Sequence, residues 1–199
     1  MLFSSLTFLF VFLPVVLIVY NILPMKAKNL WLLAASLSFY FYGEPRYLLL
    51  MLAVIFSSYI FGLLTEKAQG TKRKIILAVS VAVSLSALIF FKYTDFFISV
   101  SNGIFNTDFD LLKIALPIGI SFYTFQAISY NIDVYRGDTP AQKNPLSLAL
   151  YISLFPQLIA GPIVRYTDVA NMLKNRKHSI DGFYYGIRRF ATRKKKKIQ

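Results

Sequence analysis

The chain has 199 residues, of which 56% are hydrophobic, and a formal net charge of +13. Soluble domains are typically about 45–50% apolar, so this composition does not suit an ordinary water-soluble domain. The chain has no cysteine, which excludes disulfides and thiolate chemistry. With one histidine and nine scattered carboxylates, no metal site is expected.

Residues 1–25 contain no charged side chain. A transmembrane helix needs about 20 apolar residues, so this stretch is long enough to cross a bilayer. A signal peptide would carry a basic residue before its apolar core and a small-residue cleavage site after it, and neither is present. We therefore expect a retained membrane helix.

Five further apolar segments follow the first one. Helices satisfy their own backbone hydrogen bonds in lipid, whereas a β-barrel would show short segments of strict alternation. The sequence therefore predicts an all-α, polytopic helical membrane protein with about five transmembrane helices and a broken last segment. The five segments are residues 29–43, 47–64, 75–91, 114–132 and 146–164.

Loops rich in Lys and Arg tend to lie in the cytoplasm. The net charges of successive loops along this chain alternate as the rule requires. Lys26 and Lys28 place the first loop inside and the N-terminus outside. Residues 66–74 carry four basic side chains and one acidic one, which suits the inside. Residues 92–113 carry two lysines and three aspartates, which suits the outside. The short loop 133–143 then lies inside.

The last apolar segment is interrupted by the sequence L-F-P-Q-L-I-A-G-P-I-V-R-Y, residues 154–166. If this segment crossed the membrane, residues 165–199, with eleven basic side chains and two acidic ones, would lie outside. A re-entrant hairpin that loses helix near Pro156 and turns at Gly161–Pro162 keeps them inside. The alternative is an ordinary proline-kinked helix.

Residues 179–190 have the pattern of a basic amphipathic helix, with Ile180, Phe183, Tyr184 and Ile187 at i, i+3, i+4 and i+7. Such a helix suits the surface of anionic membrane lipid; packing against the rest of the protein is the alternative. The positive charge is therefore explained by the orientation of the chain in the membrane and by binding to anionic lipid. No nucleic-acid partner is expected.

Polar side chains gather in residues 116–137. Tyr123, Gln126 and Tyr130 stand at i, i+3 and i+7, so one face of this helix is polar. Polar groups at membrane depth are costly and often functional, although a seam between helices uses the same residue types. Gln157 and Arg165 flank the broken segment, where Arg165 either binds an anionic group or extends to the headgroups. All five are candidate substrate-binding or tunnel-lining residues.

No nucleophile–base pair is visible, so no catalytic residue is assigned. His178 lies in the basic linker N-R-K-H-S and is interpreted as a surface histidine.

Three motifs carry a resemblance to a known family. They are L-P-I-G-I-S-F-Y-T-F-Q-A-I-S-Y-N-I-D-V-Y-R-G (116–137), Y-I-S-L-F-P-Q-L-I-A-G-P-I-V-R-Y (151–166) and G-F-Y-Y-G-I-R-R-F (182–190). Together they resemble the membrane-bound O-acyltransferase (MBOAT) family, most closely its bacterial alginate O-acetyltransferase branch. The resemblance runs from Met1 to about Phe190.

The resemblance implies a many-helix disc with a tunnel, in the inner (plasma) membrane of a bacterium. It implies that an acyl group, derived from acetyl-CoA or held on an acyl carrier, passes to a hydroxyl of an extracellular polysaccharide or to a partner protein. No bound cofactor is implied. The family's catalytic histidine lies in its C-terminal half, in the membrane, and would act as a general base.

The sequence departs from the family after Phe190, where it reads A-T-R-K-K-K-K-I-Q. We expect residues 1–190 to be the N-terminal part of an MBOAT transmembrane domain and residues 191–199 to be an aberrant basic tail of a truncated or frameshifted product. Since His178 does not match the family's catalytic histidine, the chain alone is expected to be inactive. The alternative function is a non-enzymatic membrane protein, transporter-like or a scaffold.

Overall fold

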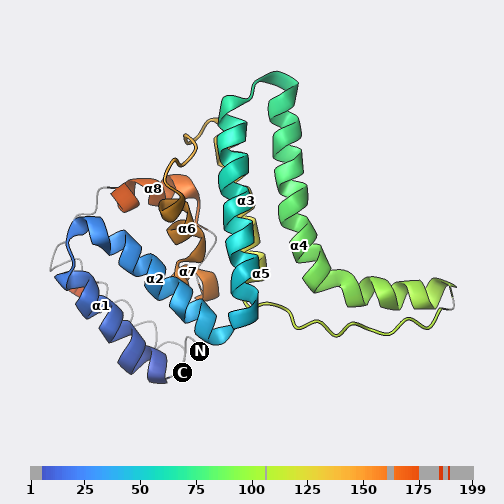
Figure 1. Ribbon diagram of the computed structural model, residues 1–199, viewed down its shortest axis with the longest axis horizontal. Coiled ribbons are helices and arrows are strands. Elements are labelled where there is room, and N and C mark those ends of the chain that lie inside the picture. The colour runs from blue at the N-terminus through green and yellow to red at the C-terminus, as the bar shows by residue number, and fades with distance from the viewer. Residues whose placement is uncertain (1–5, 106, 161–163, 175–183, 186–187, 189–199) are drawn as a thin grey trace. The chain divides into compact units, whose positions relative to one another are not determined.

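The computed structural model describes residues 6–105, 107–160, 164–174, 184–185 and 188 of the chain. The chain divides into two compact units, Met1–Val169 and Ala170–Gln199. The described residues are helical or irregular, without a strand, so the all-α prediction is confirmed for them (Figure 1). In chain order the elements are the π-helical turn η1 (Phe8–Phe12), α1 (Leu13–Ile22), α2 (Met25–Gly43), the 3₁₀ turn η2 (Pro45–Tyr47), α3 (Leu48–Lys67), α4 (Gly70–Phe105), α5 (Ile120–Arg136), α6 (Pro145–Ser153), α7 (Phe155–Ala160) and α8 (Tyr166–Lys174).

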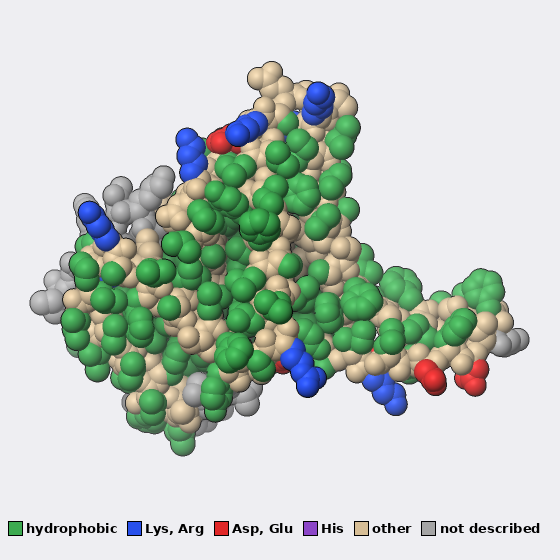
Figure 2. Space-filling view, viewed as in Figure 1, with side chains coloured by type: hydrophobic (Ala, Val, Ile, Leu, Met, Phe, Trp, Pro, Cys, Tyr) green, Lys and Arg blue, Asp and Glu red, His purple; other side chains and the backbone are tan. Residues whose placement is uncertain are grey.

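Two of the described helices are long and apolar enough to cross a membrane, Pro45–Lys67 and Gly70–Phe105. The segments Phe8–Ile22 and Pro145–Leu158 are apolar but shorter. Figure 2 shows hydrophobic side chains over much of the visible face, and basic side chains near the end where α3 joins α4. These features support a membrane protein. The expected count of about five spans stays a prediction.

Helices α3, α4 and α5 pack against one another, and α2 packs against α6. A second core lies where η1, α1 and α2 meet α7. Here the rings of Phe8, Phe12, Phe39 and Phe155 approach one another with centroid separations of 5.3–5.9 Å. Aromatic pairs at this separation contribute beyond their buried area, so this cluster fixes α7 against the first two helices.

The predicted helix over 114–132 begins later than expected. Residues 109–117 are irregular, and α5 starts at Ile120 after Gly119, which has a φ of +76°. Proline lacks a backbone donor and glycine accepts a left-handed conformation, so Pro117 and Gly119 delay the start. At the other end α5 continues to Arg136 and stops at Gly137, whose φ is +83°.

Several predictions concern residues outside the described ones. They are the turn at Gly161–Pro162, the surface position of His178, and the domain boundary at residue 190 with its basic tail. Of the predicted amphipathic helix 179–190, only Tyr184, Tyr185 and Arg188 are described, and these are helical and exposed.

Candidate functional site

The helix break in the last apolar segment lies next to Pro156. Helix α6 ends at Ser153, Leu154 adopts φ −57° and ψ 113°, and α7 begins at Phe155. In a continuous helix the ring of Pro156 would clash with the carbonyl of residue 152. The predicted loss of helix near Pro156 is therefore confirmed. The break is at Leu154, two residues before the proline, and Pro156 itself lies in the first turn of α7.

Two side chains from other helices satisfy backbone groups at this break. Gln126 of α5 donates from Nε2 to the carbonyl of Tyr151, at 2.8 Å. The amide of Phe155 donates to Ser36 Oγ of α2, at 3.3 Å, and Ser36 in turn donates to the carbonyl of Leu32. Backbone groups released at a helix end need such partners when buried. Irregular backbone is tolerated at membrane depth where protein covers it, and here α2 and α5 provide that cover.

The start of α5 also approaches α7 closely. A Cβ placed on Gly119 would lie 3.2 Å from Leu158 Cγ, and the positive φ of Gly119 disfavours a side chain in any case. A larger residue at position 119 would therefore separate α5 from α7. The glycine keeps the polar face of α5 beside the break.

Further polar side chains lie on the helices that contact the break. Tyr123 lies three residues before Gln126 on one face of α5, and Tyr40 lies four residues after Ser36 on one face of α2. Their rings meet edge to face with centroids 6.4 Å apart. Gln157 follows the break in α7. The hydroxyl groups of Tyr40 and Tyr123 also interact with each other, whereas the buried Gln157 Nε2 has no hydrogen-bond partner among the described residues.

Tyr130, a third candidate on α5, lies in a tight contact with α3. Its Oη accepts a hydrogen bond from the amide of Gln142 at 2.9 Å, and its ring packs edge to face on Tyr166. A Cβ on Gly62 of α3 would lie 2.7 Å from this Oη. Tyr130 thus joins α3, α5 and the loop before α6, which is the interhelical role considered as the alternative.

Arg165, the fifth candidate, is exposed just before α8. It acts electrostatically on Asp133, which is buried in the last turn of α5 with Oδ2 unpaired. Burial raises the pKa of Asp133 above its usual range, and the Arg165 charge partly opposes this shift. The five candidates therefore make different contacts: Gln126 binds the backbone at the break and Gln157 lies in α7 just after it. Tyr123 packs against Tyr40 of α2, whereas Tyr130 and Arg165 have their contacts elsewhere.

A hydrogen-bonded seam, the alternative considered for the polar side chains of residues 116–137, joins α3, α4 and α5 through partners on α3 and α4 that were not predicted. Asn131 Nδ2 donates to Ser58 Oγ at 3.1 Å and to Ser80 Oγ at 2.8 Å, and all three side chains are fully buried. Small polar residues commonly join membrane helices in this way. Ser80 and Ser84, four apart in the largely apolar stretch 75–91, were the available signal in the sequence.

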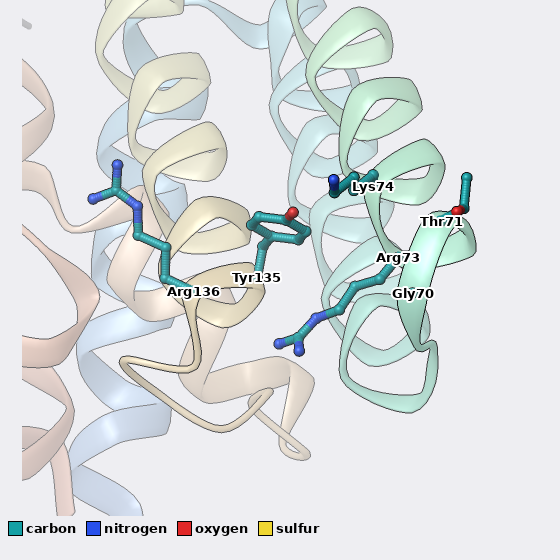
Figure 3. Close-up of a pocket in the computed structure, with 6 residues that line it drawn as sticks. All are labelled: Gly70, Thr71, Arg73, Lys74, Tyr135 and Arg136. Atoms are coloured by element: carbon teal, nitrogen blue, oxygen red, sulfur yellow. The ribbon is translucent and has the colours of Figure 1, made fainter.

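A cavity of about 540 Å³ lies where the first turn of α4 meets the last turn of α5 (Figure 3). Figure 3 shows the side chains of Arg73 and Arg136 pointing in different directions. Arg73 Nη2 donates to the carbonyl of Val134 at 2.9 Å, and its guanidinium lies over the ring of Tyr135. Arg73 therefore satisfies a carbonyl at the end of α5, and the basic groups do not converge on one ligand. No group of three potential metal-ligating residues lies together within the described ranges.

Comparison with known proteins gives relatives along the whole chain. The chain is 42% identical to the probable alginate O-acetylase AlgI of Pseudomonas putida and 43% identical to that of Pseudomonas aeruginosa, in both cases over 100% of its own length. It is 35% identical to the peptidoglycan O-acetyltransferase of Helicobacter pylori over 88% of its length. No family model and no solved structure matches.

The chain covers 42%, 39% and 39% of these three relatives, so it spans about 40% of their length. The alignments with the two alginate O-acetylases extend over every helix described above. The similarity to alginate O-acetylases of the membrane-bound O-acyltransferase family, expected from the three motifs, is therefore confirmed over the full length of this chain.

Proposed function

We propose that this chain provides part of a membrane-embedded O-acetyltransferase that esterifies hydroxyl groups of a polysaccharide. The observation that carries the proposal is the identity of 42–43% to alginate O-acetylases over the whole chain. The similarity to a peptidoglycan O-acetyltransferase supports the same chemistry, because both named activities attach acetyl groups to carbohydrate polymers.

The reaction needs a donor that carries the acetyl group as an activated ester. An acceptor hydroxyl oxygen forms the new ester bond to the acetyl carbonyl carbon, the bond to the donor breaks, and the hydroxyl proton leaves to a base. The donor is acetyl-CoA-derived or an acyl carrier, and donor and acceptor proteins are the expected partners. We assign no described residue to the role of base.

The described residues contribute a polar passage at the break between α6 and α7. Tyr123, Gln126 and Gln157 would line it, with Tyr130 and Arg165 at its edges. The support is that Gln157 Nε2 is buried without a hydrogen-bond partner among the described residues, three residues after Leu154 at the break, and that the buried Tyr123 packs against Tyr40 of α2. Unsatisfied polar groups in hydrocarbon cost several kcal/mol each, so their persistence suits a site that accommodates a polar substrate.

The proposed setting is the inner membrane of a bacterium, crossed by about five helices with the N-terminus outside. Residues 146–164 would form a re-entrant segment, lined by α2 and α5. Single cysteines at Lys72 and Asp108 test the topology, because the chain has no native cysteine. An impermeant maleimide should label position 108 in intact cells and position 72 only after lysis; the reverse pattern would overturn the arrangement.

A chimera tests the function. The portion of Pseudomonas aeruginosa AlgI that aligns with residues 1–190 is replaced by these residues, and the chimera is expressed in a strain without its own AlgI. A parallel chimera uses the Helicobacter pylori relative. We expect ester-linked acetate on at least one of the two polymers, alginate or peptidoglycan. Two chimeras that reach the membrane in normal amount and acetylate neither polymer would contradict the proposal.

Site variants in the active chimera test the passage. Tyr123→Phe and Gln157→Leu remove the Tyr123 hydroxyl and the Gln157 amide with little change in volume and should lower acetylation while the protein level stays constant. Ser86→Ala is the matched control, because Ser86 is exposed on α4 and donates only to the carbonyl of Val83 in its own helix. Unchanged acetylation in both site variants would show that Tyr123 and Gln157 do not line the passage.

A further inference from the structure

Helix α4 is too long to lie wholly within a membrane. Its 36 residues rise about 54 Å at ~1.5 Å each, whereas the hydrocarbon core is about 30 Å thick. Lys74 and Lys92 bracket an uncharged stretch that would rise about 27 Å. This stretch matches the core, so the residues of α4 after Lys92 lie beyond it.

The part of α4 after Lys92 leaves the helix bundle. The buried residues of α4 are Ser80, Ser84 and Leu88, and none follows them. Figure 1 shows α4 bending so that its last part runs away from α3. The Thr94 hydroxyl donates to the carbonyl of Phe90, and bonds of this kind often bend helices. We call residues 92–105, together with the returning segment 107–116, the outer arm.

One face of the arm helix holds the returning segment through specific hydrogen bonds. Asp95 Oδ1 accepts from the amides of Leu112 and Lys113, at 2.9 and 3.3 Å. Asn102, seven residues on, accepts from the amide of Phe109 and donates to its carbonyl. These bonds make the arm a defined hairpin whose polar face is already occupied.

The base of the arm is attached to the start of α3. Tyr47 Oη donates to the carbonyl of Ala115 at 2.9 Å, and the Tyr47 ring meets Phe91 edge to face at 5.5 Å. The direction of the arm is therefore set by contacts at its base.

The opposite face of the arm helix is apolar and exposed. Tyr93, Phe97, Val100 and Ile104 stand at i, i+4, i+7 and i+11, which is one side of a helix. They are 41%, 57%, 41% and 68% exposed. Figure 2 shows the arm with hydrophobic side chains along one edge and acidic and basic ones along the other. A contiguous apolar stripe of this kind marks an interaction surface.

The stripe continues the lipid-facing side of the spanning part of α4. Val79, Val83 and Phe90 are 45%, 42% and 52% exposed, and positions 83, 90, 97 and 104 are spaced by seven residues on one helix face. The surface that meets the bilayer along the span therefore runs without interruption into the arm. This continuity favours lipid as the occupant.

We propose that the outer arm is an interfacial anchor that lies on the outer leaflet, with Tyr93, Phe97, Val100 and Ile104 inserted at the boundary between headgroups and acyl chains. Amphipathic helices with aromatic and aliphatic side chains bind bilayers in this position. The arm carries two lysines and three aspartates, which agrees with the outer side. This inference rests on the membrane embedding in the proposed function, but not on acyl transfer.

Spin labels test the position of the arm in the full chain. Single cysteines replace Phe97, Val100 and Ile104 on the stripe, and Ser99 and Gly103 beside it as controls. Both controls are exposed, and a Cβ on Gly103 would meet nothing within 4 Å. In vesicles of phosphatidylethanolamine and phosphatidylglycerol, we expect a severalfold higher ratio of oxygen to nickel-chelate accessibility at the stripe than at the controls.

Labels at Val79 and Val83 report insertion of the span in the same vesicles. If these are oxygen-accessible while the stripe is as nickel-accessible as the controls, the arm lies in water and the proposal is wrong. If neither oxygen nor the nickel chelate reaches the labels on the stripe, protein covers it, and this result also overturns the proposal. Nickel access at Val79 and Val83 would overturn the membrane embedding as well.

Discussion

Gln126 on α5 donates a hydrogen bond to the backbone carbonyl of Tyr151 on α6, 2.8 Å away, at the place where α6 loses its helical continuation. Both groups are buried. The carbonyls in the last turn of any helix lack an intrahelical partner, and this one is satisfied by a side chain 25 residues earlier in the chain. The bond links the polar face of α5 directly to the helix break.

Replacing Gln126 by Leu should destabilise the protein. The change keeps a similar volume but leaves the Tyr151 carbonyl buried and unsatisfied, which costs about 1–3 kcal/mol. The free energy of unfolding in detergent measures the effect. Ser86→Ala, which alters only an exposed bond within α4, should change this free energy by much less. Equal losses in the two variants would mean that the Gln126 bond contributes nothing specific.

Part of this arrangement follows from the sequence. The spacing of Tyr123, Gln126 and Tyr130 predicts one shared face, and the structure buries all three side chains. Proline chemistry predicts the break near Pro156. The hydrogen-bond partners at the break do not follow from the sequence in this way, because Gln126 and Ser36 bond to backbone atoms of another helix. Side-chain periodicity carries no information on which backbone group lies opposite.

The ends of the helices could likewise be predicted only in part. Gly137 ends α5 where a left-handed glycine is expected to end a helix. Helix α4 extends beyond the predicted segment 75–91, because Lys92 and Asp95 are residues that predict the start of a loop. In the structure Asp95 remains helical and binds the returning segment of the outer arm. A tertiary contact thus keeps polar residues in a helix.

Gly62 and Gly103 should respond oppositely to alanine. A Cβ on Gly62 would lie 2.7 Å from Tyr130 Oη, and overpacking of this kind costs about 1–3 kcal/mol. A Cβ on Gly103 meets nothing within 4 Å, so Gly103→Ala should gain up to about 1 kcal/mol from helix propensity. Thermal unfolding of the two variants in the same detergent compares them. A loss of stability in G103A equal to that in G62A would contradict the contact with Tyr130.

Asp133 predicts a pH dependence of stability. Burial raises its pKa in the folded state above the unfolded value, so the folded state holds the proton more tightly. Stability is then greatest below the unfolded pKa and falls as the pH rises through the interval between the two values. Asp133→Asn should therefore be more stable than the wild type at neutral pH, with the difference shrinking on acidification. Asp110→Asn, at an exposed position whose charge does not act on Asp133, is the control; a larger gain there would refute the assignment.

His178 is expected to have no role in acetyl transfer. It is the one histidine of the sequence, and its neighbours in the sequence are those of a basic linker, N-R-K-H-S. In the active chimera, His178→Ala should leave the acetate content of the polymer unchanged, since the base would come from the portion of the relative that is retained. A loss of about 10²-fold or more, the usual effect of removing a general base, would make His178 catalytic.

The seam of Ser58, Ser80 and Asn131 should show a measurable coupling energy between α4 and α5. Asn131 Nδ2 lies 2.8 Å from Ser80 Oγ, and hydrogen bonds between membrane helices contribute about 0.6 kcal/mol on average and up to about 1.7 kcal/mol. A double-mutant cycle of Ser80→Ala and Asn131→Ala isolates this bond, because the cavity left by each substitution cancels in the cycle. The matched cycle pairs Asn131→Ala with Ser84→Ala, one turn away on α4, where the buried serine has no bond to Asn131. A coupling in the Ser84 cycle as large as in the Ser80 cycle would show that the effect is general packing of α4 on α5 rather than this hydrogen bond.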